Sequence, residues 1–138
     1  MSRFSTRRIG RLIATSGIAS ALLLGTLAAP AATFARGGDG VRATGTCTIN
    51  STSKLKAKHD DGRIEVEFEV DQNRNNRLWT VRIWDDGVRV FTGTRRTVAP
   101  SGSFTVERRI PNRAGTDTIV ARAVNASTGE VCRAKVNL

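Results

Sequence analysis

Hydrophobic and polar residues alternate with a period of two from position 41 to position 138, and turn-forming residues interrupt the alternation repeatedly. Such alternation is typical of β-strands that bury one face and expose the other, whereas a helix repeats its hydrophobic positions about every three to four residues. We find no helical repeat in this segment. The pattern therefore predicts an all-β fold, a single antiparallel sandwich of about seven strands.

The clearest predicted unit is a hairpin over residues 54–70 that turns at Asp61-Gly62, a dipeptide favoured in two-residue hairpin loops. With this turn, each lysine of the first strand lies opposite a glutamate of the second: Lys54–Glu69, Lys56–Glu67 and Lys58–Glu65. The residues between the lysines lie opposite hydrophobic residues: Leu55–Phe68, Ala57–Val66 and His59–Ile64. A slip of one residue would turn the hydrophobic face toward water. The pattern thus specifies the register as well as the strands.

The remaining predicted strands follow the same pattern. We expect one strand over residues 41–48, a hairpin over 78–97 around Asp85-Asp86-Gly87, a strand over 103–110, and a last hairpin over 116–138. In the second hairpin Trp79, Val81 and Ile83 would share one face, which leaves Trp84 on the other.

The first 35 residues have a different character, with four arginines, no acidic residue, and an uncharged run from position 12 to position 29. A basic start, an apolar run and small residues before position 36 predict a signal peptide over residues 1–35, cleaved after Ala35 or alternatively after Ala32. A flexible segment, 36–40, and the sandwich domain, 41–138, would follow. Thr6-Arg7-Arg8-Ile9 leaves twin-arginine export open beside the general secretory route. The alternative for the apolar run is a membrane anchor.

Charge and cysteine content fit a secreted protein. The chain has 22 Lys and Arg against 12 Asp and Glu. Removal of the four leader arginines leaves 22 − 4 = 18 basic residues against 12 acidic ones, a net charge near +6. Cys47 and Cys132 are the only cysteines, and an even number in an exported chain predicts a disulfide. A basic surface can attract nucleic acid, anionic lipid or an acidic wall polymer, but it is also common in exported proteins without such a partner.

Several residues resemble those of immunoglobulin and fibronectin type III sandwiches: Trp79 on the third strand, Gly115-Thr116-Asp117 before the sixth strand, and the stretch 117–130. The resemblance covers nearly all of residues 41–138 and implies an immunoglobulin-like sandwich. Ala121 and Ala123 stand where that family has a cysteine, so the disulfide would join the first and last strands. The chain also resembles small exported bacterial proteins of this architecture that have no assigned role.

The residue types that carry catalysis are scarce. His59 is the only histidine, and we expect it to lie partly buried at the rim of the hydrophobic face. Glu65, Glu67 and Glu69 would each be paired with a lysine, which holds carboxylate pKa values low and does not suit a general acid. One His and two disulfide-bonded Cys cannot form a zinc site. We therefore expect no enzyme, no metal and no cofactor.

One segment offers oxygen ligands. Residues 71–76, Asp-Gln-Asn-Arg-Asn-Asn, begin like a calcium-binding loop, but position twelve is Arg82 in place of a glutamate. A plain turn is the competing interpretation, because Asn and Asp tolerate left-handed backbone conformations. We interpret the segment as a turn.

The exposed aromatic residue Trp84 and the arginines near it are the candidate binding residues: Trp84, Arg82, Arg89, Arg95 and Arg96. An outward Trp can stack on a sugar or a partner protein, and the alternative is that Arg89 covers the ring. We expect a non-catalytic secreted binding module for an envelope polymer or an extracellular protein. Nucleic acid is not expected, because few aromatics accompany the arginines. The alternative function is inhibition of an extracellular hydrolase through loop 97–101.

Overall fold

The computed structural model describes residues 40–138. The predicted signal peptide, residues 1–35, and all but the last residue of segment 36–40 lie outside the described residues. Over residues 40–138 no helix is long and apolar enough to span a membrane.

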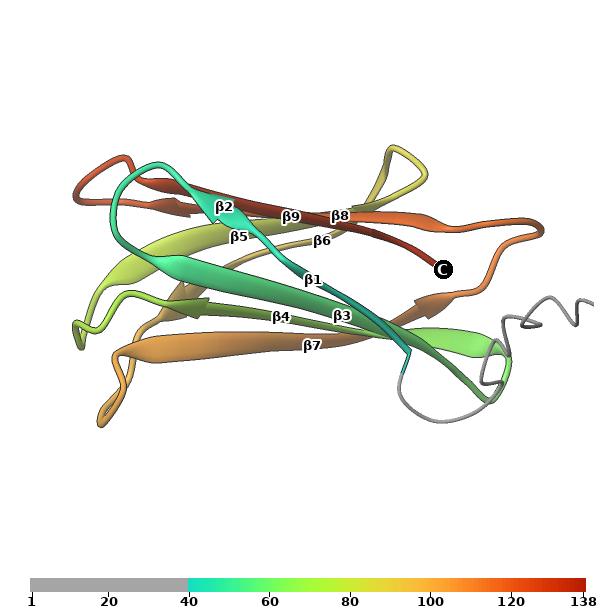
Figure 1. Cartoon of the computed structure of the whole chain (residues 1–138), viewed down its shortest axis with the longest axis horizontal. Helices are drawn as coiled ribbons and strands as arrows, with labels where there is room; N and C mark the ends of the chain where they lie inside the picture. Colours follow the sequence, from blue (N-terminus) through green and yellow to red (C-terminus); the bar gives the residue numbers. More distant parts are fainter. Residues whose placement is uncertain (1–39) are drawn as a thin grey trace, which may run out of the picture. The chain divides into compact units, whose positions relative to one another are not determined.

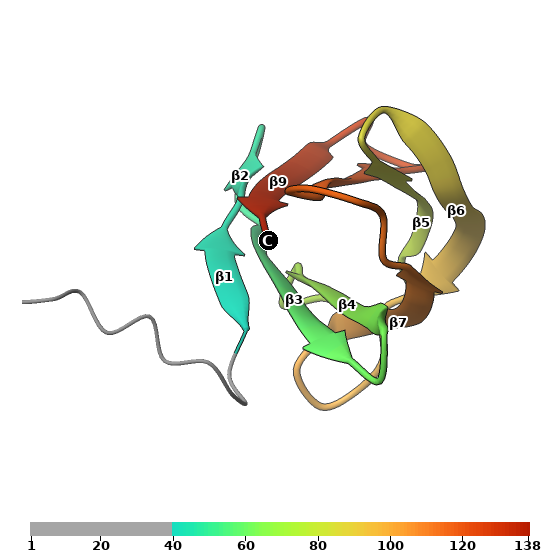
Figure 2. The ribbon, with the colours of Figure 1, turned by 90° about the vertical axis from the view of Figure 1, so that its right-hand side faces the viewer.

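Nine antiparallel β-strands form two sheets that face each other (Figure 1, Figure 2). The strands are β1 (Val41–Thr44), β2 (Thr46–Cys47), β3 (Thr52–Asp60), β4 (Arg63–Asp71), β5 (Leu78–Asp85), β6 (Val88–Arg96), β7 (Ser103–Pro111), β8 (Thr118–Asn125) and β9 (Val131–Asn137). One sheet has the order β1-β3-β4-β7 and the other the order β2-β9-β8-β5-β6. The predicted all-β sandwich is confirmed.

The structure has nine strands in place of the expected seven or so. The predicted segments already contain eight strands, and the ninth arises in the N-terminal segment. The strand expected over 41–48 divides at Gly45 into β1, which pairs with β3, and β2, which pairs with β9. In Figure 1 this segment crosses from one layer to the other. A Cβ on Gly45 would lie 2.3 Å from Ser53 Oγ and 2.5 Å from the Arg133 carbonyl oxygen. Only glycine therefore fits at this crossing.

The register predicted for the first hairpin is confirmed at every pair from Lys54–Glu69 to His59–Ile64. Its turn residues Asp61 and Gly62 have φ values of 47° and 72°, the left-handed conformation that two-residue hairpin turns require. Lys58 Nζ lies 3.2 Å from Glu65 Oε2 on the outer face. Because the turn sets the register, it also sets which lysine and glutamate lie opposite each other.

Alternate residues of the strands fill the space between the sheets. Trp79 is fully buried, packs against Phe104 with ring centroids 6.1 Å apart, and donates a hydrogen bond from Nε1 to Gln72 Oε1. Trp79, Val81 and Ile83 all face this core, as the alternation predicted.

The predicted disulfide joins Cys47 on β2 to Cys132 on β9, which are direct neighbours in the five-stranded sheet. It ties the N-terminal segment to the last strand. This pairing was expected because Ala121 and Ala123 stand where immunoglobulin domains have a cysteine. The closed loop has a sequence separation of 85 residues. A covalent link across so long a loop removes much of the entropy of the unfolded chain.

We expect the double variant Cys47→Ala/Cys132→Ala to lose about 3–4 kcal/mol of unfolding free energy, because its unfolded chain regains that loop entropy. Urea denaturation of the oxidised protein and the variant measures the difference, with reduced wild-type protein as a second reference. An unchanged unfolding midpoint would show that the bond contributes nothing to stability.

Candidate functional site

Trp84 lies on the outer face of the five-stranded sheet. Along β5 the residues alternate between buried and partly exposed, and Trp84 takes an outward position between buried Ile83 and buried Asp85. Its cross-strand neighbours are Val120 on β8 and Arg89 on β6. The predicted outward orientation of Trp84 agrees with this placement.

Three arginines form a row across the same face. Arg82 on β5 is paired with Arg122 on β8, and Arg122 is paired with Arg133 on β9. Directly opposite residues on neighbouring antiparallel strands have Cβ atoms about 4.5–5.5 Å apart, and like charges at that spacing repel. This arginine row therefore works against the stability of the sheet.

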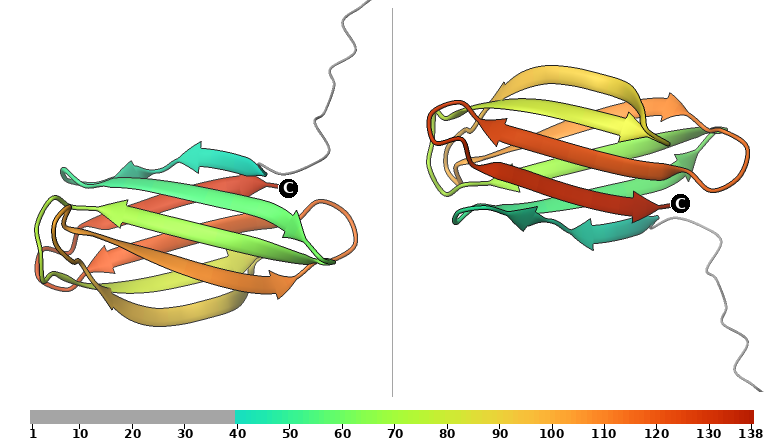
Figure 3. Two further views of the ribbon diagram at one scale, coloured as in Figure 1. Left: turned by 90° about the horizontal axis from the view of Figure 1, so that it is seen from below. Right: turned by 90° about the horizontal axis from the view of Figure 1, so that it is seen from above.

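No acidic side chain on the outward positions of β2, β9, β8, β5 or β6 relieves the repulsion. The basic side chains on this face are Arg82, Arg89, Arg96, Arg122, Arg133 and Lys135. We call this surface the basic face; the right-hand view of Figure 3 shows its sheet.

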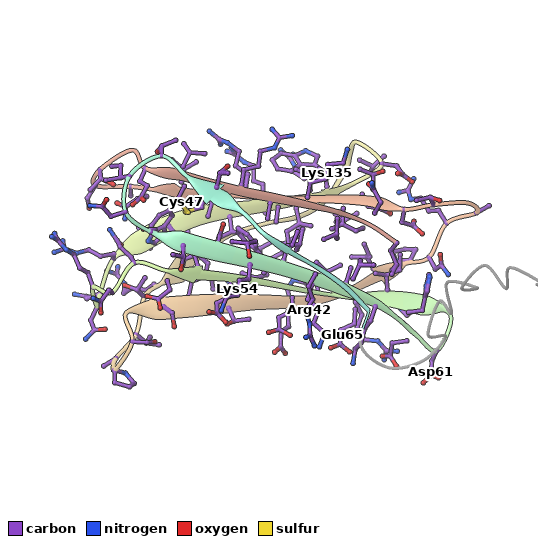
Figure 4. All side chains as sticks on the ribbon, viewed as in Figure 1. Arg42, Cys47, Lys54, Asp61, Glu65 and Lys135 are labelled. Carbon is purple, nitrogen blue, oxygen red and sulfur yellow. A yellow bond between two sulfur atoms is a disulfide. The ribbon has the colours of Figure 1, made fainter. Side chains whose placement is uncertain are left out.

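The outer face of the four-stranded sheet has a different charge pattern. It carries equal numbers of basic and acidic side chains: Arg42, Lys54, Lys56, Lys58, Arg63 and Arg109 against Asp60, Glu65, Glu67, Glu69, Asp71 and Glu107. Figure 4 labels Lys54 and Glu65 on this sheet and Lys135 on the other. Outside the two faces, the charges of residues 36–138 also cancel. The net charge of that segment thus equals the charge of the basic face.

A shallow hollow of about 330 Å³ lies on the basic face beside Trp84. Its lining combines the indole with two members of the arginine row: Trp84, Gly87, Thr118, Val120, Arg122 and Arg133. An aromatic surface next to guanidinium donors can hold a ring that carries an anionic group.

The structure separates the arginines that the sequence grouped with Trp84. Arg82 and Arg89 lie near Trp84, and Arg96 lies on the same face at the other end of the hairpin, opposite Leu78. Arg95 is paired with Trp79 instead and belongs to the opposite side of the sheet.

Arg95 contributes to a cluster at the edge between β6 and β7. Its guanidinium carbon lies 5.4 Å from the centre of the Phe91 ring, and that of Arg108 lies 4.3 Å from it. Among the described residues the cation–π contacts are both at Phe91, so Arg89 does not cover Trp84 in this way.

The basic face includes three residues that were not among the candidates from the sequence: Arg122, Arg133 and Lys135. Their alternation along β8 and β9 marks them as outward residues, but only the strand order β9-β8-β5 places them beside Arg82 and Trp84.

The candidate catalytic groups do not assemble. His59 is exposed, so the expectation that it is partly buried is wrong; it lies at the end of β3, beyond the reach of the core. The Asn112 amide nitrogen lies 3.4 Å from its Nδ1. The carboxylates of β4 face the lysines of β3, as predicted.

The segment 71–76 has the geometry of a turn. Asp71 Oδ1 accepts a hydrogen bond from the Asn73 backbone nitrogen at 2.8 Å, and Asn73 and Asn76 have φ values of 55° and 61°. The local bond and the left-handed conformations account for Asp71, Asn73 and Asn76.

A group of acidic residues at one end of the five-stranded sheet was not singled out from the sequence. Asp85 and Asp117 are buried, and Asp86 is exposed next to them. Arg113 Nε lies 3.2 Å from Asp85 Oδ2. Burial, with the carboxylates of Asp117 and Asp86, raises the pKa of Asp85 above its usual value, and Arg113 offsets part of that rise.

We expect Arg122→Thr to raise the unfolding free energy by a few tenths of a kcal/mol at low ionic strength, since it removes the centre of the arginine row. The gain should shrink as salt screens the charges. Lys58→Thr is the matched control, because Lys58 has an acidic partner and its loss should not stabilise the protein. A destabilised Arg122→Thr variant would contradict the repulsion.

Asp85→Asn should stabilise the protein at pH 7, because burial and the carboxylates of Asp117 and Asp86 disfavour the charged form of Asp85 that the variant removes. The pKa of Asp85 is higher in the folded protein than in the unfolded chain. The stability of the wild type therefore falls as the pH rises from the unfolded-state pKa through the folded-state pKa. The advantage of the variant should therefore disappear in acid, below the unfolded pKa. Urea titrations at both pH values measure it, with exposed Asp61→Asn as the control. A less stable variant at pH 7 would show that the attraction to Arg113 dominates.

Comparison with known proteins adds little to this description. No family model matches the chain, and no curated protein matches it. Among solved structures, a chitin binding domain from Burkholderia pseudomallei has a TM-score of 0.35 and 17% identity, covering 55% of this chain and 51% of that chain. Chicken MD-1 complexed with lipid IVa has a TM-score of 0.29 and 13% identity, covering 72% of this chain and 97% of that chain. The match thus spans about half of the chitin binding domain, and likenesses at these scores carry no functional information.

Proposed function

We propose that this protein is a non-catalytic, secreted binding module that holds an anionic polysaccharide of the cell envelope on its basic face. The observation that carries the proposal is the row of Arg82, Arg122 and Arg133, which has no acidic partner on the same face. A sheet gains nothing in stability from such a row. An anionic ligand would supply the missing counter-charges.

The contrast between the two sheets supports this assignment. The four-stranded sheet matches its lysines with glutamates, whereas the basic face carries the net charge of residues 36–138 on one surface. A general excess of arginine in the chain would be spread over both sheets. Charge concentrated on one side instead raises the local concentration of an anionic partner and orients its approach.

Trp84 favours a sugar polymer over nucleic acid. Modules that bind single-stranded nucleic acid place several aromatic rings along a basic groove, so that successive bases can stack. On the basic face Trp84 is the single aromatic residue among the outward positions of the strands. One ring beside two guanidinium groups suits one pyranose unit with neighbouring carboxylate or phosphate groups.

The leader and the disulfide support the proposed secretion. Residues 1–35 have the pattern of an export signal, and Cys47–Cys132 requires an oxidising compartment to persist. Secretion would bring the basic face into contact with envelope polymers.

Trp84→Ala should weaken retention on an immobilised carboxylated or phosphate-bearing polysaccharide about tenfold, the equivalent of about 1.4 kcal/mol. Arg122→Thr should weaken it as well and reduce its salt dependence, while Lys58→Thr, on the other sheet, should bind like wild type. Affinity measurements on anionic polysaccharide, neutral polysaccharide and DNA compare the ligand classes. Equal retention of all variants, or stronger binding to neutral polymer or DNA, would contradict the proposal.

Loop 97–101 gives a second candidate function, inhibition of an extracellular hydrolase. Buried Thr97 anchors the loop by donating a hydrogen bond to the Arg74 carbonyl at 2.6 Å and accepting one from the Arg77 backbone nitrogen at 2.9 Å. Beyond this anchor Val98 is 60% exposed. A fixed loop with an exposed apolar residue can fill an enzyme pocket. Inhibition of one secreted protease by wild type and not by Val98→Asp would support this function over polymer binding.

A further inference from the structure

The acidic cluster at the end of the five-stranded sheet comes from two separate segments of the chain. Asp85 ends β5, Asp86 begins the turn to β6, and Asp117 immediately precedes β8. One carboxylate oxygen from each lies within 4.8 Å of the other two. Three negative charges are thus gathered at a point where the fold buries two of them.

Of the four oxygens of the two buried carboxylates, one has a hydrogen-bond donor, since Asp117 Oδ1 accepts from the Arg113 backbone nitrogen at 3.3 Å. Asp85 is 0% exposed and Asp117 is 1% exposed. Among the described residues, neither oxygen of Asp85 accepts a hydrogen bond, and Asp117 Oδ2 accepts none. Buried carboxylate oxygens ordinarily have donors or a cation, because removing them from water is costly. These orphan oxygens therefore indicate a missing partner.

Arg113 supplies only part of what the cluster needs. Its Nε lies 3.2 Å from Asp85 Oδ2, within ion-pair distance. The side chain is 42% exposed and comes from the loop between β7 and β8. One guanidinium against three carboxylates leaves two negative charges uncompensated.

The backbone around the carboxylates is held in place. The Asp86 nitrogen donates to the Thr118 carbonyl at 3.0 Å, and the Thr118 nitrogen donates to Asp86 Oδ1 at 2.9 Å. Asp117 and Leu138 exchange two backbone hydrogen bonds of 3.0 Å. The carboxylates would therefore need little rearrangement to bind a cation, and binding would lose little conformational entropy.

We propose that Asp85, Asp86 and Asp117 bind a calcium ion that displaces the Arg113 guanidinium from Asp85. Calcium takes six to eight oxygen ligands in flexible geometry, which three carboxylates completed by water can provide. The donor set contains no nitrogen or sulfur, so it does not suit zinc or copper. The ion would balance the uncompensated charge. The calcium proposal does not rest on the polysaccharide proposed for the basic face.

The test is a thermal denaturation series on the purified protein, first treated with chelator and then titrated with calcium or magnesium. Wild type should gain about 5 °C in its unfolding midpoint at saturating calcium. Half of the shift should occur at about 10⁻⁴–10⁻³ M, the range of extracellular calcium modules, and magnesium should have less effect.

Variants locate the ion. Asp117→Asn and Asp85→Asn should lose the calcium shift, and Asp85→Asn should be no less stable than wild type in chelator, so its loss cannot be attributed to misfolding. Arg113→Ala removes the competing cation and should show a larger calcium shift at a lower concentration. Asp71→Asn is the matched control, because it tests the other oxygen-rich segment, 71–76, and should keep the full shift.

Three results would overturn the proposal. They are the absence of a calcium-dependent shift in wild type, a full shift in both Asp85→Asn and Asp117→Asn, and loss of the shift in Asp71→Asn. A smaller shift in Arg113→Ala would show that the arginine supports the ion and does not compete with it, which would overturn the displacement.

Discussion

The register of the antiparallel strands fixes both the core and the surface of this protein. Because successive strand residues point to opposite faces, each register decides which side chains are buried and which meet across the surface. Two-residue turns with left-handed backbones at Asp61-Gly62 and Asp86-Gly87 set two of these registers. A slip of one residue in β5 would bury Trp84 and the neighbouring arginine and expose Trp79. Core and basic face thus arise from one alternation.

Charge is distributed between the two sheets in different ways. In the four-stranded sheet, lysines of β3 face glutamates of β4, so the surface is neutral and each pair contributes little to stability. In the five-stranded sheet, Arg82, Arg122 and Arg133 face one another. Repulsion of this kind lowers stability, and proteins commonly accept such a loss where a site serves binding. The asymmetry is the physical basis for assigning a ligand to one sheet.

The acidic cluster shows the opposite arrangement a short distance along the same strand. Asp85 directly follows Trp84 and points to the other side of the sheet, toward the buried Asp117. The exposed side of this strand end therefore attracts anions, while its buried side attracts cations. The two proposed sites are compatible because the strand's alternation directs Trp84 and Asp85 to opposite faces.

The amino-acid sequence predicted the sandwich, most of the strand positions, the first hairpin's register and the disulfide. Each of these depends on local features: alternation, an Asp-Gly turn, or an even cysteine count. It also indicated that Trp84 points outward, because that follows from alternation within one strand. It grouped Arg95 with Trp84 by closeness in the chain, although the two lie on opposite faces.

The order of the strands within each sheet could be seen only in the folded protein. The order β9-β8-β5 brings Arg133 and Arg122 to Arg82, and the return of the chain before β8 brings Asp117 to Asp85. The same packing divided the first expected strand at Gly45 between two sheets. These contacts join residues far apart in sequence. They could not be predicted, because alternation specifies the face on which a residue lies but not the strand beside it.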